Sequence, residues 1–316
     1  MSSVNDIYPS GSHQVTFREV SLRDGLQQVQ EYPSTEGKHA WIAQGKEAGL
    51  RHFEVGSFLP PARYPQFADV RDLINFVDQT DDVFSSVLVM NERAIFDAVE
   101  TNVDELVCVV SATEEHSQAN MRRSQSASID LILAACKARK SSAKKYVIVA
   151  ALPMSFGCSI AGDVPKQKML NLVASCLEAG ADVISIADTV GFASPLQITD
   201  LARDVVKLCG KVPVIIHLHD TRGLGLANAA AALDVGIHII DGAIGGLGGC
   251  PFAPGATGNV VLEDLVFLCE RMGYRTGTDI QKLIDMRQIL AREMPDELLY
   301  GTLARAGLPS KIDWGS

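Results

Sequence analysis

The sequence predicts an α/β fold, a (β/α)8 TIM barrel with extra C-terminal helices beside the barrel mouth. Short runs rich in β-branched residues alternate with helical patterns, which is typical of repeated βα units that build a parallel sheet. Eight such runs are present, and eight parallel strands close naturally into a barrel. A chain of 316 residues is long enough for one barrel of this kind.

The predicted strands follow one another at intervals that leave room for a helix after each. No linker or shift in composition divides the chain, so we expect one domain over residues 1–316, with the barrel at about 14–275 and the additional helices at about 278–310. The eight strands are expected at residues 14–22, 52–58, 84–89, 104–112, 145–152, 182–188, 212–219 and 239–245.

Start and stop signals support the helices between these strands. Ser34 precedes a helical pattern that ends near Gly49, and Ser194 precedes one that ends near Gly210. After the last strand, helical patterns continue to about Arg305. We expect these last helices to pack beside the mouth of the barrel.

Composition argues against several classes of protein. The net charge of -10 argues against a nucleic-acid partner, because phosphate binding needs a concentration of Lys and Arg. No apolar run is long enough to cross a bilayer, and the N-terminus resembles no signal peptide, so we expect a cytoplasmic protein without a membrane partner. The seven cysteines are odd in number and widely spaced, which predicts reduced core residues, with Cys250 as the exception.

Polar residues gather where the predicted strands end, and in a barrel of this type the reactive groups lie at the carboxyl ends of the strands. A glycine-rich loop, residues 245–249, follows the last strand and leads to two further polar residues. The residues at these positions are Arg23, Asp24, Glu54, Asp188, His217, His219, Cys250 and Asn259.

A pair of histidines in the seventh strand predicts a metal site. His217 and His219 are two residues apart, so both side chains point to the same face, the barrel interior. A carboxylate from Asp24 and an amide oxygen from Asn259 would complete a set suited to Mg²⁺ or Mn²⁺, and less well to zinc. The alternative is a pair of buried histidines satisfied by neighbours. The presence of Asp24 and Asn259 in the same barrel favours the metal site.

Three motifs carry a resemblance to a known family: RDGLQ at 23–27, HLHDT at 217–221 and GGLGGCPFAPGATGN at 245–259. The chain resembles the hydroxymethylglutaryl-CoA lyase family, metal-dependent TIM barrels related to isopropylmalate synthase, over residues 14–290. The first two motifs are shared across that superfamily. The third, a Cys-Pro-Phe-Ala loop that ends in Gly-Asn, is typical of the lyases.

The resemblance implies a role for each of these residues. Asp24, His217, His219 and Asn259 would hold the divalent ion, and Arg23 would face the thioester oxygen of an acyl-CoA. In the same way, Cys250 becomes the proton donor or acceptor. Glu54 and Asp188 match acidic positions that orient the arginine, a water molecule on the metal, or a histidine. For Gln27 the alternatives are substrate positioning and a simple turn-forming role.

The implied reaction is retro-Claisen cleavage of 3-hydroxy-3-methylglutaryl-CoA, or a close analogue, to acetyl-CoA and a keto acid such as acetoacetate. The reaction must deprotonate a tertiary alcohol and stabilise an enolate, and both tasks need positive charge. His217 or a water molecule on the metal would take the proton, and Cys250 would protonate the enolate carbon. Ser111, His116 and Asn120, just past the fourth strand, would contact the acyl chain or coenzyme A, unless they form a solvated loop.

Some positions depart from the family's usual residues and leave the acyl group open. Leu22, Gln28, Val29, Arg222 and Phe252 are such positions, so a longer-branched glutaryl-CoA or citramalyl-CoA is an alternative substrate. The alternative reaction is acetyl-CoA condensation of the isopropylmalate or homocitrate synthase type. A non-catalytic barrel that binds metal or acyl-CoA is a third hypothesis, and the intact site argues against it. The expected partners are a small acyl-CoA and a second copy in a homodimer.

Overall fold

A closed parallel barrel forms the centre of the molecule, and its strands follow in the order β1 to β8, with β1 paired to β8. The structure, a computed structural model, describes residues 4–8, 11, 13–142, 144–248 and 258–310. Each predicted strand is found, most of them shorter by one to five residues, so the predicted fold class is confirmed. The strands are β1 (Thr16–Glu19), β2 (His52–Ser57), β3 (Phe84–Val89), β4 (Glu105–Val109), β5 (Val147–Leu152), β6 (Val183–Asp188), β7 (Val214–Leu218) and β8 (Ile239–Gly242).

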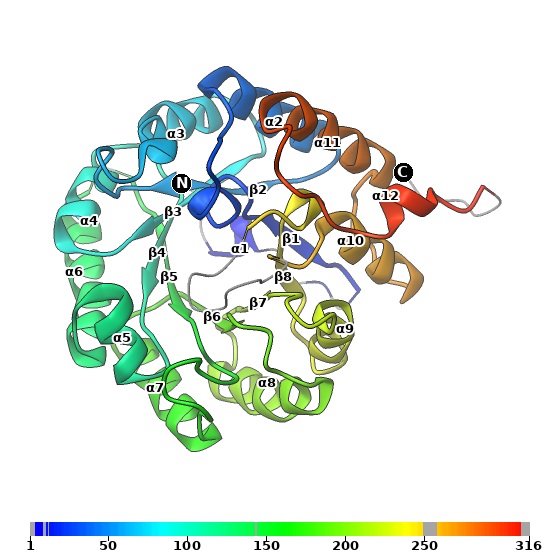
Figure 1. Ribbon diagram of the computed structural model, residues 1–316. Coiled ribbons are helices and arrows are strands. Elements are labelled where there is room, and N and C mark those ends of the chain that lie inside the picture. The colour runs from blue at the N-terminus through cyan, green and yellow to red at the C-terminus, as the bar shows by residue number, and fades with distance from the viewer. Residues whose placement is uncertain (1–3, 9–10, 12, 143, 249–257, 311–316) are drawn as a thin grey trace.

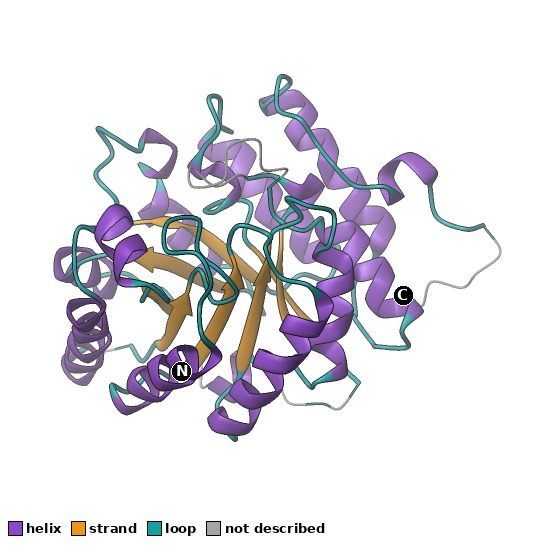
Figure 2. Ribbon diagram, turned by 60° about the horizontal axis from the view of Figure 1, so that its bottom comes forward, coloured by secondary structure: helices purple, strands orange, loops and turns teal. Residues whose placement is uncertain are grey.

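Helices surround the barrel on its outside (Figures 1 and 2). The predicted start signals are confirmed, because the side chain of Ser34 accepts a hydrogen bond from Gly37 N and Ser194 forms a capping box with Gln197. The helices are α1 (Val4–Ile7), α2 (Thr35–Glu47), α3 (Val70–Asp78), α4 (Glu92–Val99), α5 (Glu114–Met121), α6 (Gln125–Ser141), α7 (Lys166–Glu178), α8 (Pro195–Cys209), α9 (Gly225–Asp234), α10 (Leu262–Arg271), α11 (Ile280–Glu293) and α12 (Leu303–Ala306). Short 3-10 turns η1 (Gly25–Gln27), η2 (Pro65–Phe67) and η3 (Ile244–Gly246) lie between them.

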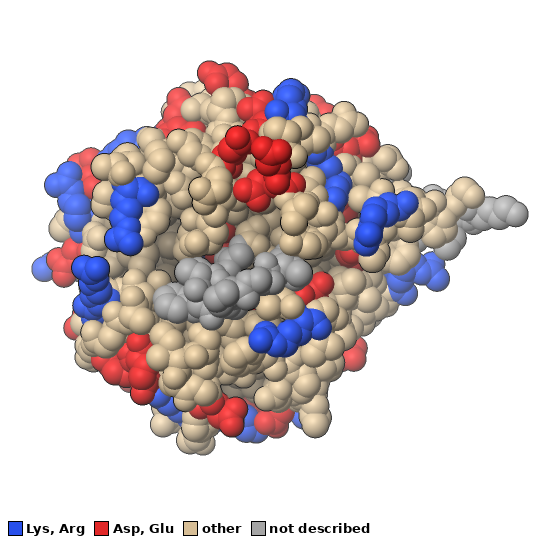
Figure 3. Space-filling model, in the orientation of Figure 1, with Lys and Arg blue, Asp and Glu red and all other residues tan. Residues whose placement is uncertain are grey.

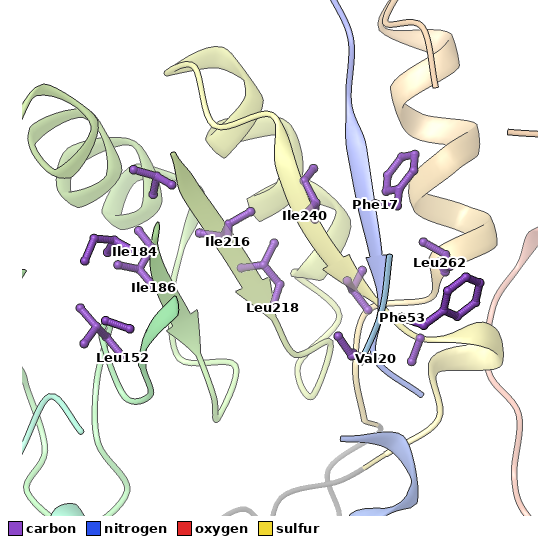
Figure 4. Close-up of a cluster of buried hydrophobic side chains, with 14 of the residues drawn as sticks. Phe17, Val20, Phe53, Leu152, Ile184, Ile186, Ile216, Leu218, Ile240 and Leu262 are labelled. Atoms are coloured by element: carbon purple, nitrogen blue, oxygen red, sulfur yellow. The ribbon is translucent and has the colours of Figure 1, made fainter. Parts of the chain in front are cut away.

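Successive strand residues point alternately outward and inward, and this divides the core in two. The outward side chains, among them Phe17, Ile186 and Ile216, belong to the core cluster that packs under the helices (Figure 4). The inward side chains form a separate cluster inside the barrel, which also contains Ile7 of α1 and the adjoining Tyr8. The N-terminal segment therefore packs against the residues inside the barrel.

The C-terminal helices lie beside the mouth, as predicted, and the helical patterns expected from Asp279 to about Arg305 form two helices. Helix α11 ends at Glu293 and α12 begins at Leu303, because Pro295 disfavours helical backbone at the residue before it. The segment between them reaches the loop after β8, where Tyr300 N donates to Gly245 O at 2.7 Å. Helix α11 packs against α2 (Figure 1).

None of the described helices has the length and apolar character needed to cross a bilayer. On the face shown in Figure 3, Lys and Arg are interspersed with Asp and Glu around the rim.

Candidate active site

A cavity opens at the carboxyl ends of the strands, and most of the predicted site residues line it. The turn after β1 carries Arg23 and Asp24, β2 contributes Glu54, and His217 and His219 come from β7 and its end. Pairing of β1 with β8 closes the barrel and brings its first and last strands side by side. Residues separated by almost 200 positions therefore share one cavity.

Three predicted metal ligands lie close enough to hold one ion. The Nε2 atoms of His217 and His219 are 3.1 Å apart, and Oδ2 of Asp24 lies 4.0 Å from the first and 3.6 Å from the second. Ligands at about 2.1 Å from an octahedral ion stand about 3 Å apart when adjacent and about 4.2 Å apart when opposite. All three separations fall within that range, so this donor set fits a divalent cation.

Asn259, the fourth predicted ligand, adjoins this group. Its Nδ2 donates to Oδ2 of Asp24 at 2.8 Å, and an isolated bridge pairs its backbone with that of His219. Its Oδ1 is buried and has no hydrogen-bond partner among the described residues. A buried acceptor without a donor is costly, and an ion held by the neighbouring ligands would satisfy it.

The charges around the site also suit a cation. Burial alone would raise the pKa of Asp24, but Arg23 and the two histidines outweigh it and hold that pKa well below its usual range. Burial alone would lower the pKa of His217, but Asp241 and Asp24 outweigh it and raise that pKa. When ionised, the buried cluster has two guanidinium groups for four carboxylates, and a divalent ion would balance the difference. The cluster comprises Arg18, Arg23, Asp24, Glu54, Glu105 and Asp241.

Arg23 is held in place by three side chains. Its Nε lies 2.8 Å from Oε1 of Glu54, and its Nη1 donates to Oε1 of Gln27 at 3.2 Å and to Oδ1 of Asp24. Burial raises the pKa of Glu54, although Arg23 opposes the shift. The guanidinium group is therefore fixed beside the metal ligands, where it can meet a developing negative charge.

Two residues that support His217, Asp241 and Arg18, were not predicted from the sequence. Oδ2 of Asp241 in β8 lies 3.0 Å from Nδ1 of His217, and Oδ1 of the same carboxylate accepts from Nη1 of Arg18 at 3.0 Å. Nη2 of Arg18 donates hydrogen bonds to Oε2 of Glu105 at 3.2 Å and to Oγ of Ser86 at 3.3 Å. A carboxylate on Nδ1 directs Nε2 of a histidine toward a metal. The available signal was a charged residue inside an otherwise apolar strand.

Three other predicted residues, Asp188, Ser111 and Asn120, are not part of the ligand group. Both carboxylate oxygens of Asp188 accept backbone N–H groups, from Phe192 at 2.8 Å and Ala193 at 3.2 Å, so this side chain orders the loop after β6. Ser111 is fully buried, with its Oγ 2.8 Å from Nδ1 of His116. Asn120 lines the cavity together with that histidine. Substrate contacts by Ser111 and Asn120, and a catalytic role for Asp188, stay predictions.

Cys250 lies outside the described residues, so its predicted role as a proton donor is not addressed by the geometry. The other six cysteines are free thiols, five buried and one partly buried. The prediction of reduced core cysteines is confirmed for these six.

Comparison with known proteins decides the family. The family model described as HMGL-like matches residues 14–290. The chain belongs to this family.

The HMGL-like relatives are carbon–carbon lyases. A hydroxymethylglutaryl-CoA lyase of Bacillus subtilis is 35% identical over 282 residues, which are 89% of this chain and 93% of the relative. An (R)-citramalyl-CoA lyase of Chloroflexus aurantiacus is 34% identical over 281 residues, 85% of this chain and 88% of the relative. The solved structure of an HMG-CoA lyase from Acinetobacter baumannii, in complex with coenzyme A and 3-methylmalate, superposes with a TM-score of 0.88 at 33% identity and covers 99% of both chains. The resemblance inferred from the three motifs is thereby confirmed.

Proposed function

We propose that this protein is a divalent-metal-dependent lyase that cleaves 3-hydroxy-3-methylglutaryl-CoA, or a close 3-hydroxyacyl-CoA, to acetyl-CoA and a keto acid such as acetoacetate. The observation that carries the proposal is the group of Asp24, His217 and His219 beside a fixed Arg23 in one cavity. Relatives named as lyases for hydroxymethylglutaryl-CoA and citramalyl-CoA support it.

The bond changes of the proposed reaction require one group that activates the hydroxyl and another that stabilises the enolate. The substrate hydroxyl loses its proton, the bond between C2 and C3 breaks, C3 becomes the carbonyl of the keto acid, and the electron pair passes to C2 as a thioester enolate. Protonation of C2 then gives acetyl-CoA. A Mg²⁺ or Mn²⁺ ion on Asp24, His217, His219 and Asn259 would supply Lewis acidity that lowers the pKa of the hydroxyl. Arg23 would stabilise the enolate oxygen.

The geometry bears on which group takes the hydroxyl proton. Nδ1 of His217 faces Asp241 at 3.0 Å, so only its Nε2 can act, and Nε2 is also the metal-ligand atom. One nitrogen lone pair cannot hold an ion and accept a proton at the same time. We therefore propose that His217 is a metal ligand only. The acceptor of the hydroxyl proton is then a water molecule oriented by the acidic side chains.

We also propose roles for the other residues of the site. Cys250 protonates the enolate carbon, Glu54 and Gln27 hold Arg23 in place, and coenzyme A enters from the side of Asn120. A homodimer and a cytoplasmic location are also proposed. Acetyl-CoA condensation onto a 2-oxo acid, the synthase reaction, is the competing proposal, because it uses a similar metal and arginine.

Product analysis tests the reaction class. Purified protein is treated with EDTA, supplied with Mg²⁺ or Mn²⁺, and incubated with hydroxymethylglutaryl-CoA and citramalyl-CoA while acetyl-CoA and the keto acid are measured by mass spectrometry. Both products should form in equal amounts from at least one thioester, and only with the metal. Condensation of acetyl-CoA with a 2-oxo acid, without cleavage of either thioester, would overturn the proposal in favour of the synthase.

A further inference from the structure

One side of the active-site cavity is lined mainly by apolar side chains of the strands, together with the polar residues His116 and Asn120 of α5 and Thr189 after β6. Strands β3, β4, β5 and β6 contribute the lining residues Leu88, Val107, Val109, Ala151, Ser185 and Ala187, and Met90 and Pro153 follow the ends of two of these strands. Apart from Ser185, these side chains are hydrocarbon or thioether. We call this set the apolar wall. All proposed metal ligands and Arg23 come from the opposite side, formed by β1, β2, β7, β8 and the loops that follow them.

Only part of the apolar wall is exposed, since Leu88, Val107, Val109, Ser185 and Ala187 are buried, with 4 to 8% of their surface exposed. Ala151 and Met90 are partly exposed, although they sit inside the barrel mouth. Ala151 and Ala187 leave only one methyl group each at this level, and the cavity has a volume of about 170 Å³. That volume holds roughly a dozen water-sized groups, by the rule that each needs about 10 to 15 Å³.

Arg18, which forms the floor of the cavity, does not provide a binding site for an anion. Arg18 lines the cavity, but its guanidinium group is already paired with Asp241 and Glu105, at 3.0 and 3.2 Å, and with Ser86. Two carboxylates on one guanidinium leave no excess positive charge for a second carboxylate. The part of a ligand that lies between this floor and the apolar wall is therefore hydrocarbon.

Substrate stereochemistry connects this wall to the proposed reaction. The carbon that bears the hydroxyl has three other substituents: the thioester arm, which points toward Arg23, an acidic arm, and a branch. The hydroxyl and the thioester arm are drawn to the charged side by Arg23 and the ligand group. The branch is the group without charge, so it is the one that can cover the apolar wall.

We propose that the acyl site accepts 3-hydroxyacyl-CoA thioesters whose hydroxyl-bearing carbon carries an alkyl branch longer than methyl. This inference rests on the proposed lyase function and names its substrate class. A methyl branch would cover less of the exposed part of the apolar wall, at Met90, Ala151 and Pro153, than a longer alkyl branch. Each further methylene that is buried raises kcat/KM by about fourfold until the space is filled.

A series of thioesters with methyl, ethyl, propyl and butyl branches tests the inference. With metal-loaded wild-type protein, kcat/KM is expected to rise from methyl to at least propyl by about fourfold per methylene. A methyl thioester that is cleaved best, with each longer branch worse, overturns the inference and leaves the lyase function intact. Failure to cleave any member overturns the lyase function itself, so the two failures are distinguishable.

Two variants with larger side chains in the cavity test whether the apolar wall causes the preference for a longer branch. Ala151→Leu and, separately, Val109→Phe should lower kcat/KM for the propyl thioester at least tenfold relative to the methyl thioester. Ala306→Leu, which adds the same side chain at an exposed position of α12, should leave that ratio unchanged. Because each readout is a ratio of two substrates on one protein, partial misfolding cancels, and Ala151→Val is a smaller change if the first variant does not fold. An unchanged ratio in both filled variants would overturn the inference.

Discussion

Strands β7, β8, β1 and β2 present charged and ligating side chains to the barrel interior, whereas β3 to β6 line the cavity mainly with aliphatic ones. Both halves belong to one barrel and share the same alternation of inward and outward residues. The four charged strands are contiguous only because β1 pairs with β8. The difference teaches that barrel closure gathers the proposed metal ligands and Arg23 into one half of the cavity and leaves mainly aliphatic side chains in the other half.

The largest effect is expected at the proposed metal ligands. Asp24→Asn keeps the shape of the side chain but removes the charge that faces both histidines. We expect kcat/KM to fall by at least about a thousandfold together with a loss of Mn²⁺ affinity measured by calorimetry. Asp163→Asn, at an exposed position, is the control. Full Mn²⁺ affinity in Asp24→Asn would place the ion elsewhere.

The second prediction separates the arginine from the metal ligands. Arg23→Met removes the guanidinium group that Glu54 and Gln27 hold, and kcat should fall by about 10² to 10³ because the enolate loses its stabilisation. Mn²⁺ affinity should change far less than kcat. The exposed Arg93→Met is the matched control. A variant whose KM rises while kcat stays normal would reassign Arg23 to substrate binding.

The third prediction tests the support beneath His217. Asp241→Asn weakens the contact to Nδ1 and should cost about 10- to 100-fold in Mn²⁺ affinity or turnover. Glu105→Gln changes the other carboxylate on Arg18, which does not touch the histidine, and should cost less. Equal losses in the two variants would show that the effect comes from the buried ion pairs in general and not from the orientation of His217.

The smallest effect lies below the cavity, at His52. This side chain stacks between Tyr8 and Phe84, and burial, assisted by Arg18 and Arg51, lowers its pKa to about 3. Between about pH 3 and 6.5 the unfolded chain takes up a proton that the folded protein does not. The free energy of unfolding therefore falls as the pH falls, by up to about 1.4 kcal/mol per pH unit from this group.

His52→Phe keeps the stacking and removes this proton uptake. Urea unfolding at pH 5 and pH 7 should show a smaller loss of stability at the lower pH in the variant than in the wild-type protein. His13→Phe, at an exposed position, should behave as wild type. The same pH dependence in all three proteins would mean that His52 is not buried in its neutral form.

The sequence was sufficient for the barrel and for part of the site. Alternating β-branched runs predict the strands, and the spacing of His217 and His219 places both on one face whatever the neighbouring strands do. Asp241 could not be found in this way, because its contact with His217 depends on the register between β7 and β8. The sequence could not show which contacts Asp188 makes, since a carboxylate that orders its own loop has the same position in the sequence as one that orients a site residue.

Metal occupancy and cleavage measured in the same sample test the central claim most directly. EDTA-treated protein is titrated with Mn²⁺ while bound ion is followed by electron paramagnetic resonance and acetyl-CoA release from the best-cleaved thioester is followed in parallel. We predict one tightly bound ion per chain and a cleavage rate that rises in proportion to occupancy. Full cleavage by the metal-free protein, or tight binding of Mn²⁺ that leaves the rate unchanged, would contradict the account.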